Sequence, residues 1–192
     1  MRYPAKHKIA TRRRIVSGAS AALRARGVAG VGVAELMREA GLTHGGFYAH
    51  FPSKDALVAE AVDAAAEQSA RNLRKVARRA PAGREFEAIV AAYLSPAHRD
   101  RPDRGCALAA LGPELARDSL PARQAVARHL DALLDLLQEY MRERPGGSRR
   151  RRAIATLSCL VGALLLSRMA RDRDVSDEIL AAAQRHLTGI AD

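Results

Sequence analysis

The stretch "GLTHGGFYAHFPSK", residues 41–54, sets two adjacent glycines between segments that have helical patterns. A glycine inside a helix costs about 0.5–1 kcal/mol relative to alanine, so Gly45 and Gly46 need a compensating contact if the stretch is helical. Phe47 and Phe51 are four residues apart, which places both rings on one face of such a helix. The stretch therefore predicts a short helix with an aromatic inner face and a bare outer face.

Helical signals lie on both sides of this stretch. Apolar residues recur at helical spacing in the two segments before it, and Gly27 and Gly41 stand where helix C-caps are expected. Thr43 is a good N-cap for the short helix, and Ser53, after Pro52, is a good N-cap for a long one. The predicted helices cover residues 11–26, 33–40, 43–51 and 53–79. Together these elements predict a helix-turn-helix.

Positive charge is concentrated in the first quarter of the chain. The 192 residues carry a formal net charge of +11, and residues 1–54 contain ten Lys and Arg against two Glu. The cations before the motif form a predicted basic N-terminal arm: Arg2, Lys6, Lys8, Arg12, Arg13 and Arg14. Such asymmetry favours a nucleic-acid partner, because phosphates supply the complementary charge.

The rest of the chain also has helical patterns. Further helices are predicted at residues 84–95, 106–119, 126–141, 149–171 and 176–190, with a polar loop at 95–105. Aromatic residues make up only 4% of the sequence, which favours helix over sheet. The predicted fold is all-α with about nine helices. It divides into a basic helix-turn-helix domain over residues 1–53 and a second helical domain over residues 54–192.

The two cysteines and the most apolar segment of the chain argue against a metal site, a disulfide-stabilised fold and a membrane span. Cys106 and Cys159 make no disulfide framework and match no zinc motif, so we expect no metal, no cofactor and a reducing cytoplasm. The opening residues lack the apolar core of a signal peptide. Residues 153–167 are too short to span a bilayer, which needs about 20 residues. They predict a buried helix, and no membrane partner is expected.

The glycines are explained if the short helix reads DNA. A helix-turn-helix lays its second helix in the major groove, and Gly45 and Gly46 would let that helix approach DNA closely. His44 and Tyr48 lie on its outer face as base-edge or sugar contacts. The predicted DNA-binding residues are Thr43, His44, Gly45, Gly46, Tyr48, His50 and Lys54, of which Thr43, His50 and Lys54 would hold phosphates. The alternative is a tight helical hairpin within a bundle.

The stretch "ELMREAGLTHGGFYAHFPSKDALVAEAV" resembles the DNA-binding domain of TetR/AcrR-family transcriptional regulators. The resemblance covers roughly residues 10–62, and the matching residues are Gly41, Tyr48, Phe51, Ser53, Lys54 and Leu57. One departure is Gly32, which stands where the family usually has Thr or Ser at the start of the second helix.

This resemblance implies that residues 54–192 form a ligand-binding and dimerisation domain. It also implies a homodimer on a palindromic double-stranded DNA operator. Its interface would be a four-helix bundle of the last two helices, 149–171 and 176–190, and Gly162 would permit close helix approach. It also implies a small-molecule inducer, unidentified by the sequence, in a pocket among the middle helices. The pocket residues predicted on this basis are Phe86, Tyr93, Leu108, Leu111, Leu134 and Met141, each of which could equally be core. The regulator would most often be a repressor.

Cys106 is a second candidate site. It follows Arg101 and Arg104 and stands near a predicted helix start, and both positive charge and a helix N-terminus favour a thiolate. The segment resembles that of a family branch in which some members sense oxidants or electrophiles through this cysteine. In such sensors a lysine of the eighth helix can approach the thiol, but the matching residue here is Arg168. The alternative is a packing residue, and Cys159 is predicted to be core.

Two other function classes remain open at this level. An enzyme with Cys106 as nucleophile would need a base such as His98 or His129 beside it, and nothing in the sequence places either there. A nonspecific architectural DNA binder would use the basic N-terminus without sequence preference.

Overall fold

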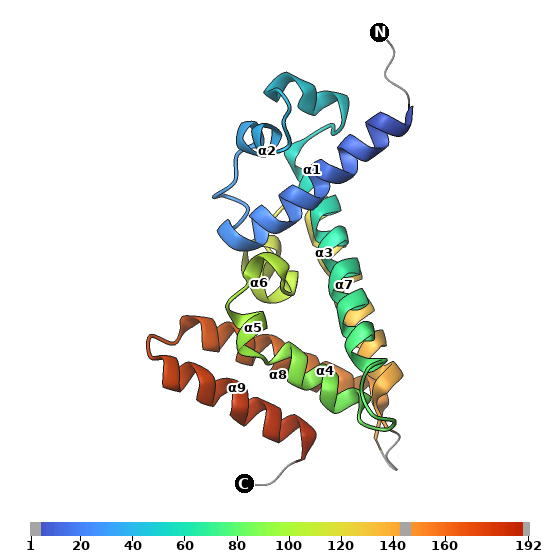
Figure 1. The fold of residues 1–192 in the computed structure, drawn as a ribbon, viewed down its shortest axis with the longest axis vertical. Helices are drawn as coiled ribbons and strands as arrows, with labels where there is room; N and C mark the ends of the chain where they lie inside the picture. Colours follow the sequence, from blue (N-terminus) through green and yellow to red (C-terminus); the bar gives the residue numbers. More distant parts are fainter. Residues whose placement is uncertain (1–4, 143–146, 190–192) are drawn as a thin grey trace.

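The computed structural model describes residues 5–142 and 147–189, and these ranges fold into α-helices, two short 3-10 helices and turns (Figure 1). The N-terminal part consists of α1 (Ala5–Arg26), α2 (Val33–Glu39), the 3-10 helix η1 (His44–Ala49) and α3 (Lys54–Ala77). The remainder consists of α4 (Glu85–Tyr93), α5 (Pro96–Arg99), the 3-10 helix η2 (Pro102–Arg104), α6 (Ala107–Leu115), α7 (Leu120–Tyr140), α8 (Arg149–Met169) and α9 (Arg173–Thr188). The all-α prediction is confirmed.

The helix ends predicted at Gly27, Gly41 and Ser53 are confirmed. Gly27 and Gly41 adopt left-handed backbone angles, with φ of +80° and +69°, after α1 and α2 respectively. A side chain is strained at such angles, so glycine is required for these turns. The Ser53 hydroxyl accepts a hydrogen bond from the Ala56 amide at 3.1 Å and caps α3 as predicted.

Three predictions about local structure are wrong. Helix α1 begins at Ala5, so the predicted arm is largely the first turns of a helix, and Arg2 lies outside the described residues. The short helix of the motif is a 3-10 helix of six residues, and Thr43 stands at its N-cap without a side-chain hydrogen bond. The predicted loop 95–105 contains α5 and η2. The "SP" pair at 95–96 was a usable signal, because serine caps α5 and proline opens it.

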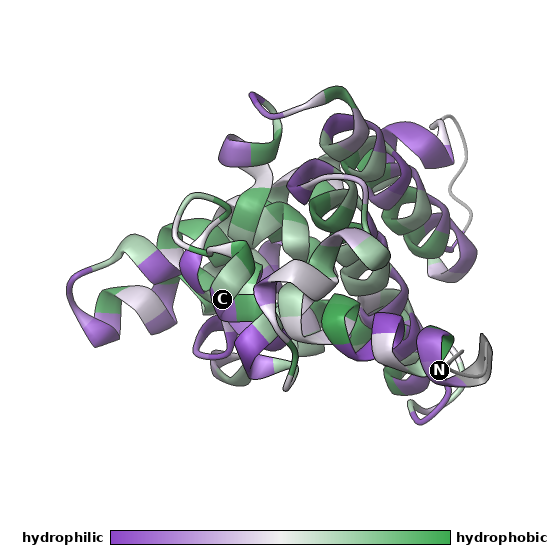
Figure 2. Cartoon of the chain, turned by 90° about the horizontal axis from the view of Figure 1, so that it is seen from above, coloured by the Kyte–Doolittle hydropathy of each residue, from purple (hydrophilic) through white to green (hydrophobic). Residues whose placement is uncertain are grey.

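The buried residues form two clusters. The N-terminal core surrounds Phe47 and Phe51 and is built from α1, α2, η1 and the first half of α3, with residues of α6 and α7 added. The C-terminal core surrounds Tyr93 and is built from α4, α7, α8 and the second half of α3, with Leu180 of α9. Helices α3 and α7 run through both parts (Figure 1), and hydrophobic residues gather between the helices (Figure 2).

Helix α8 has one buried face and one exposed face. Ala153, Leu157, Leu160 and Leu164 recur at helical spacing in the C-terminal core, whereas Ile154, Leu166 and Met169 are exposed by 45%, 55% and 71%. The prediction that Cys159 is core is wrong, because its side chain is only half-buried. Among the described helices, α8 is the one whose length and apolar composition would allow a membrane span, a test that core helices of soluble proteins also pass.

Candidate DNA-binding and regulatory sites

An aromatic base holds η1 on the N-terminal core. Phe47 and Phe51 are each 1% exposed, and their rings stack with centroids 5.5 Å apart. Arg12 of α1 lies over the outer face of the Phe51 ring, 4.5 Å from its centroid, and pairs with Glu60 of α3. This cation is therefore engaged within the protein. The inward orientation predicted for the two phenylalanines is confirmed.

The opposite face of η1 is open to solvent. Thr43, His44 and Gly45 are exposed, and the Tyr48 side chain is 69% exposed although its ring edge meets Phe47. A Cβ atom on Gly45 would meet no atom within 4 Å, and one on Gly46 would make only ordinary contacts with Met37 and Thr43. Packing within the chain therefore does not require either glycine. Close approach of an external partner remains an explanation for Gly45 and Gly46.

His50 and Lys54, on either side of Phe51 in the sequence, are both partly buried. Burial lowers the pKa of His50, and the neighbouring cations Lys8 and Arg12 lower it further. The Lys54 ammonium donates to the Val28 carbonyl at 2.8 Å, so it fastens the turn after α1 to the start of α3. The structure thus gives Lys54 a partner inside the chain, and a phosphate contact by this residue remains a prediction.

Gly32 is the N-cap of α2, as expected from the sequence. Gly32 is in extended backbone (φ −88°, ψ 145°), it provides no side-chain cap, and a Cβ there would meet nothing within 4 Å. The open space shows that the helix-turn-helix could hold a capping residue at this position. The first amides of α2 therefore lack the hydroxyl that a serine or threonine would supply.

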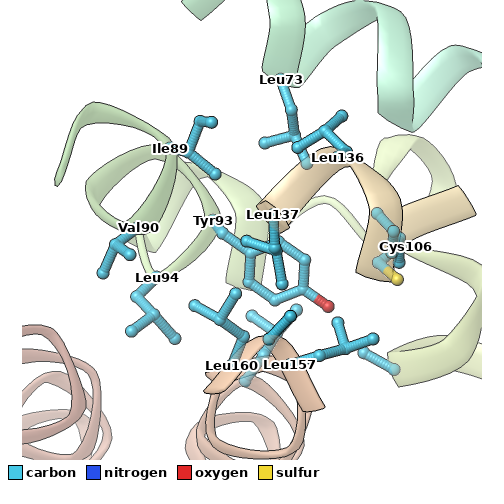
Figure 3. Close-up of a cluster of buried hydrophobic side chains, with 14 of the residues drawn as sticks. Leu73, Ile89, Val90, Tyr93, Leu94, Cys106, Leu136, Leu137, Leu157 and Leu160 are labelled. Carbon is cyan, nitrogen blue, oxygen red and sulfur yellow. The ribbon is translucent and has the colours of Figure 1, made fainter. Parts of the chain in front are cut away.

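Cys106 stands at the N-cap of α6 and is completely buried beside Tyr93 (Figure 3). Its amide donates to His98 Nε2 at 3.0 Å, and the His98 and Tyr93 rings meet edge-on with centroids 4.7 Å apart. Burial, followed by the adjacent Cys106 thiol, raises the pKa of Tyr93 well above its usual range. The thiol therefore lies in the C-terminal core, not on the surface.

The cations predicted beside Cys106 are not the ones that approach it. Arg101 and Arg104 lie on the outer side and pair with Asp103. The guanidinium of Arg24 donates to the carbonyl of Gly105, the residue before Cys106, at 2.8 Å. Arg168 donates to the carbonyls of His98 and Arg99 at 3.0 and 3.1 Å. Arg24 comes from α1, and no local sequence pattern indicated it.

In the structure His98 lies beside Cys106, which the sequence did not predict. Both ring nitrogens of His98, however, are already engaged in hydrogen bonds. His98 Nδ1 is 2.6 Å from the Tyr93 carbonyl, which can only accept, so this nitrogen carries the proton. Nε2 then accepts from the Cys106 amide, and burial lowers the pKa of His98. The imidazole has no free nitrogen with which to take a proton from the thiol. His129, the other candidate base, lies apart on α7 and has no described partner at either nitrogen.

The residues predicted to line one pocket are divided in the structure. Phe86 and Met141 border an open hollow of about 580 Å³ between α4, α7, α8 and α9. Tyr93 borders a second hollow of about 290 Å³, which also reaches His98 and Gly105. Leu111 belongs to the N-terminal core, and Leu134 is buried in the C-terminal core beside partly buried Leu108. A single pocket made by all six residues is therefore not present among the described residues.

Comparisons with known proteins agree with this geometry. Residues 15–61 match the sequence family "Bacterial regulatory proteins, tetR family", and no curated protein matches the chain. In fold, the chain is similar to reduced NemR from E. coli, with a TM-score of 0.77, 22% identity, and 94% of this chain and 96% of that chain covered.

Two further solved structures show the same fold. A TetR transcriptional regulator from Chloroflexus aurantiacus has a TM-score of 0.76 at 24% identity, with 96% of this chain and 95% of that chain covered. FadR from Bacillus subtilis, in complex with stearoyl-CoA, has a TM-score of 0.67 at 16% identity, with 92% and 95% covered. The matching N-terminal segment carries a helix-turn-helix on a helical fold shared over nearly the whole chain. Residues 15–61 thus match the tetR-family regulatory domain and carry a helix-turn-helix, and the chain as a whole has the helical fold of these solved regulators.

Proposed function

We propose that this regulator is a cytoplasmic homodimeric repressor that binds a palindromic operator and is released by a small molecule or by modification of Cys106. The observation that carries the DNA-binding part is the two-sided construction of η1. Its inner aromatic face is fixed in the N-terminal core, while Thr43, His44, Gly45 and Tyr48 are exposed. We assign base-edge or sugar contacts to His44 and Tyr48. Phosphate contacts are assigned to Thr43, His50 and Lys54, and close approach to the two glycines.

The exposed face of α8 supports the homodimer. Ile154 and Met169 lie on one side of this helix, Val175 of α9 is also exposed, and a Cβ on Gly162 would meet nothing within 4 Å. An apolar stripe of this kind is stabilised when a second helix covers it. Two subunits would present two η1 helices, and successive major grooves on one side of DNA are about 34–36 Å apart. Within the predicted interface range, Ile190 lies outside the described residues.

Operator binding tests the proposal. The DNA directly upstream of the gene is titrated at near-physiological salt with excess random DNA, and we expect saturable binding with two subunits on a palindrome. Tyr48→Phe should weaken this binding by up to about tenfold, because loss of a hydrogen bond to a neutral base edge or sugar costs about 0.5–1.5 kcal/mol. Tyr140→Phe at the far end of α7 is the matched control. Equal affinity in both variants would contradict the assignment of Tyr48, and binding abolished by the competitor would favour an architectural protein.

The thiol branch of the proposal has its own test. Peroxide oxidises a thiolate to a sulfenic acid with release of hydroxide, and the buried Cys106 thiol reacts only after local opening of α6. Cys106→Ser should bind the operator within about twofold of the parent protein, because its N-cap geometry suits serine, and should no longer release DNA on mild peroxide treatment. Cys159→Ser is the control that keeps the response. Identical responses to peroxide in the two variants would mean that Cys106 is only a packing residue.

A further inference from the structure

A groove lies between α1 and α3, in the N-terminal part of the molecule, where the two helices cross (Figure 1). Its volume is about 620 Å³. The lining residues of α1 extend from Ile9 to Ser20, which is about 16 Å along the helix axis. The groove is thus about three helical turns long, which is enough for an extended small molecule.

Two hydrogen-bond donors at one end of the groove have no acceptor among the described residues. Ser20 is 5% exposed, and its hydroxyl oxygen is buried without a hydrogen-bond partner. Gln68 Oε1 accepts from Arg24 at 3.2 Å. Because a guanidinium can only donate, the amide oxygen of Gln68 faces Arg24, and Nε2 keeps its N–H donors. Both Ser20 and Gln68 line the groove, so an acceptor that enters it can bind them.

Arg24 brings a buried positive charge to the same end of the groove. It is 5% exposed and donates to the Ser20 carbonyl at 3.0 Å, to Gln68 Oε1 and to the Gly105 carbonyl at 2.8 Å. All three acceptors are neutral, whereas buried charges in proteins are usually paired. Burial lowers the pKa of Arg24, and the negative charge of Asp103, which forms its own ion pairs, opposes this only in part. An anion bound at this end would therefore be stabilised by Arg24.

The charges along the rest of the groove also favour an anion. Glu60 is already paired with Arg12. Glu67 is paired with Arg71 one turn further along α3, at 3.1 Å. Arg13 is exposed and has no ion-pair partner among the residues that the structure describes. The groove thus has one positive charge in excess, apart from the buried one, and this balance favours a ligand with a single negative charge.

The middle of the groove is apolar. Val16 of α1 and Ala64 of α3 lie in the middle of the two lining stretches, and Ile9, which is 53% exposed, lies at the end away from Ser20. An apolar surface with a few well-placed polar groups is the usual construction of a small-molecule site. An acid group at Ser20 would place the apolar body of its molecule over Val16 and Ala64, toward Ile9.

We propose that this groove is a binding site for a small amphipathic monocarboxylate, whose acid group accepts hydrogen bonds from Ser20 and Gln68 and is stabilised by the charge of Arg24. The site is separate from the hollow that Phe86 and Met141 border. The proposal therefore goes beyond the proposed function and does not depend on it.

Equilibrium dialysis of the full chain against octanoate at pH 7 tests the site. We expect saturable binding of one octanoate per subunit. Octan-1-ol and octylammonium have the same chain without the negative charge, so they should bind at least about tenfold more weakly. Ser20→Ala removes one donor to the acid group and should weaken octanoate binding at least about tenfold.

Gln68→Glu separates loss of the site from loss of the fold. It places a carboxylate of the chain itself beside Arg24, so repulsion should weaken octanoate binding by at least about tenfold. The melting temperature should stay equal or rise, because the buried cation gains an anion. Gln124→Glu, at an exposed position of α7, makes the same change in net charge and should leave octanoate binding unchanged.

Three outcomes would overturn the proposal. The first is an absence of saturable octanoate binding, and the second is binding of octan-1-ol as tight as that of octanoate. The third is octanoate binding that is kept in Gln68→Glu but lost in Phe86→Ala, since the acid would then occupy the hollow in the C-terminal part. Failure of the parent protein to bind an operator would instead count against the proposed repressor function alone.

Discussion

Replacing Phe47 with alanine is expected to lower the free energy of unfolding by about 3–5 kcal/mol, the usual cost of removing a buried phenylalanine. Phe47 is 1% exposed, stacks on Phe51 and touches Tyr48 at its edge. The six-residue η1 is too short to be stable by itself, so its position depends on this ring. We expect operator affinity to fall by at least about 100-fold at temperatures where the far-ultraviolet circular dichroism of the chain is unchanged.

A matched variant separates this local effect from general destabilisation. Phe86→Ala removes the same side chain from the edge of the C-terminal core, where it is only partly buried. It should leave operator affinity within about threefold of the parent at equal fractions folded, measured by denaturant titration. Phe47→Leu should fall between the two. If Phe47→Ala bound the operator as tightly as Phe86→Ala, the aromatic base would not be what positions η1.

The helix-turn-helix was predictable because its determinants are local. Gly41 stops one helix by its left-handed backbone, Ser53 caps the next, and the four-residue spacing of Phe47 and Phe51 defines the inner face. Each of these signals acts within a few residues, where sequence patterns are informative. The exceptions are informative too. The pattern did not distinguish a 3-10 helix from an α-helix at residues 44–49, because a stretch of six residues fits both.

The environment of Cys106 was not predictable, because its partners come from distant parts of the chain. Arg24 reaches Gly105 over 81 positions, and Glu114 reaches Val28 over 86. Such contacts are fixed by how helices pack rather than by local propensity. The nearby Arg101 and Arg104 drew attention from the sequence, yet they pair with Asp103 on the outside. The sequence therefore predicted correctly that cations lie near Cys106, but it named the wrong residues.

His129 is a buried titratable residue whose protonation opposes folding. It lies on α7, is 1% exposed, and neither ring nitrogen has a hydrogen-bond partner among the described residues. Burial, followed by the positive charge of Arg24, lowers its pKa from 6.5 to about 4, with Asp63 acting in the opposite direction. The neutral imidazole is thus the form that the folded protein tolerates. Between about pH 6.5 and pH 4, His129 is protonated in the unfolded chain but not in the folded protein.

The free energy of unfolding is therefore expected to fall as the pH falls from about 6.5 to about 4. In that window the unfolded chain binds a proton at His129 that the folded protein does not, so acid favours unfolding. The contribution of His129 is about 3 kcal/mol, from a pKa that drops from 6.5 to about 4. Denaturant titrations at intervals between pH 7 and pH 4 measure it.

His129→Leu is the variant that isolates this contribution. Leucine fills a similar volume without a titrating group, so the loss of stability between pH 7 and pH 4 should shrink by about 2–3 kcal/mol. Stability at pH 7 should stay equal or rise by about 1 kcal/mol, because two unpaired nitrogens leave the core. His186→Leu, at an exposed position of α9, should keep the acid sensitivity of the parent. An unchanged pH profile in His129→Leu would mean that His129 finds a partner for its proton in the folded state, and that the acid sensitivity of the chain arises elsewhere.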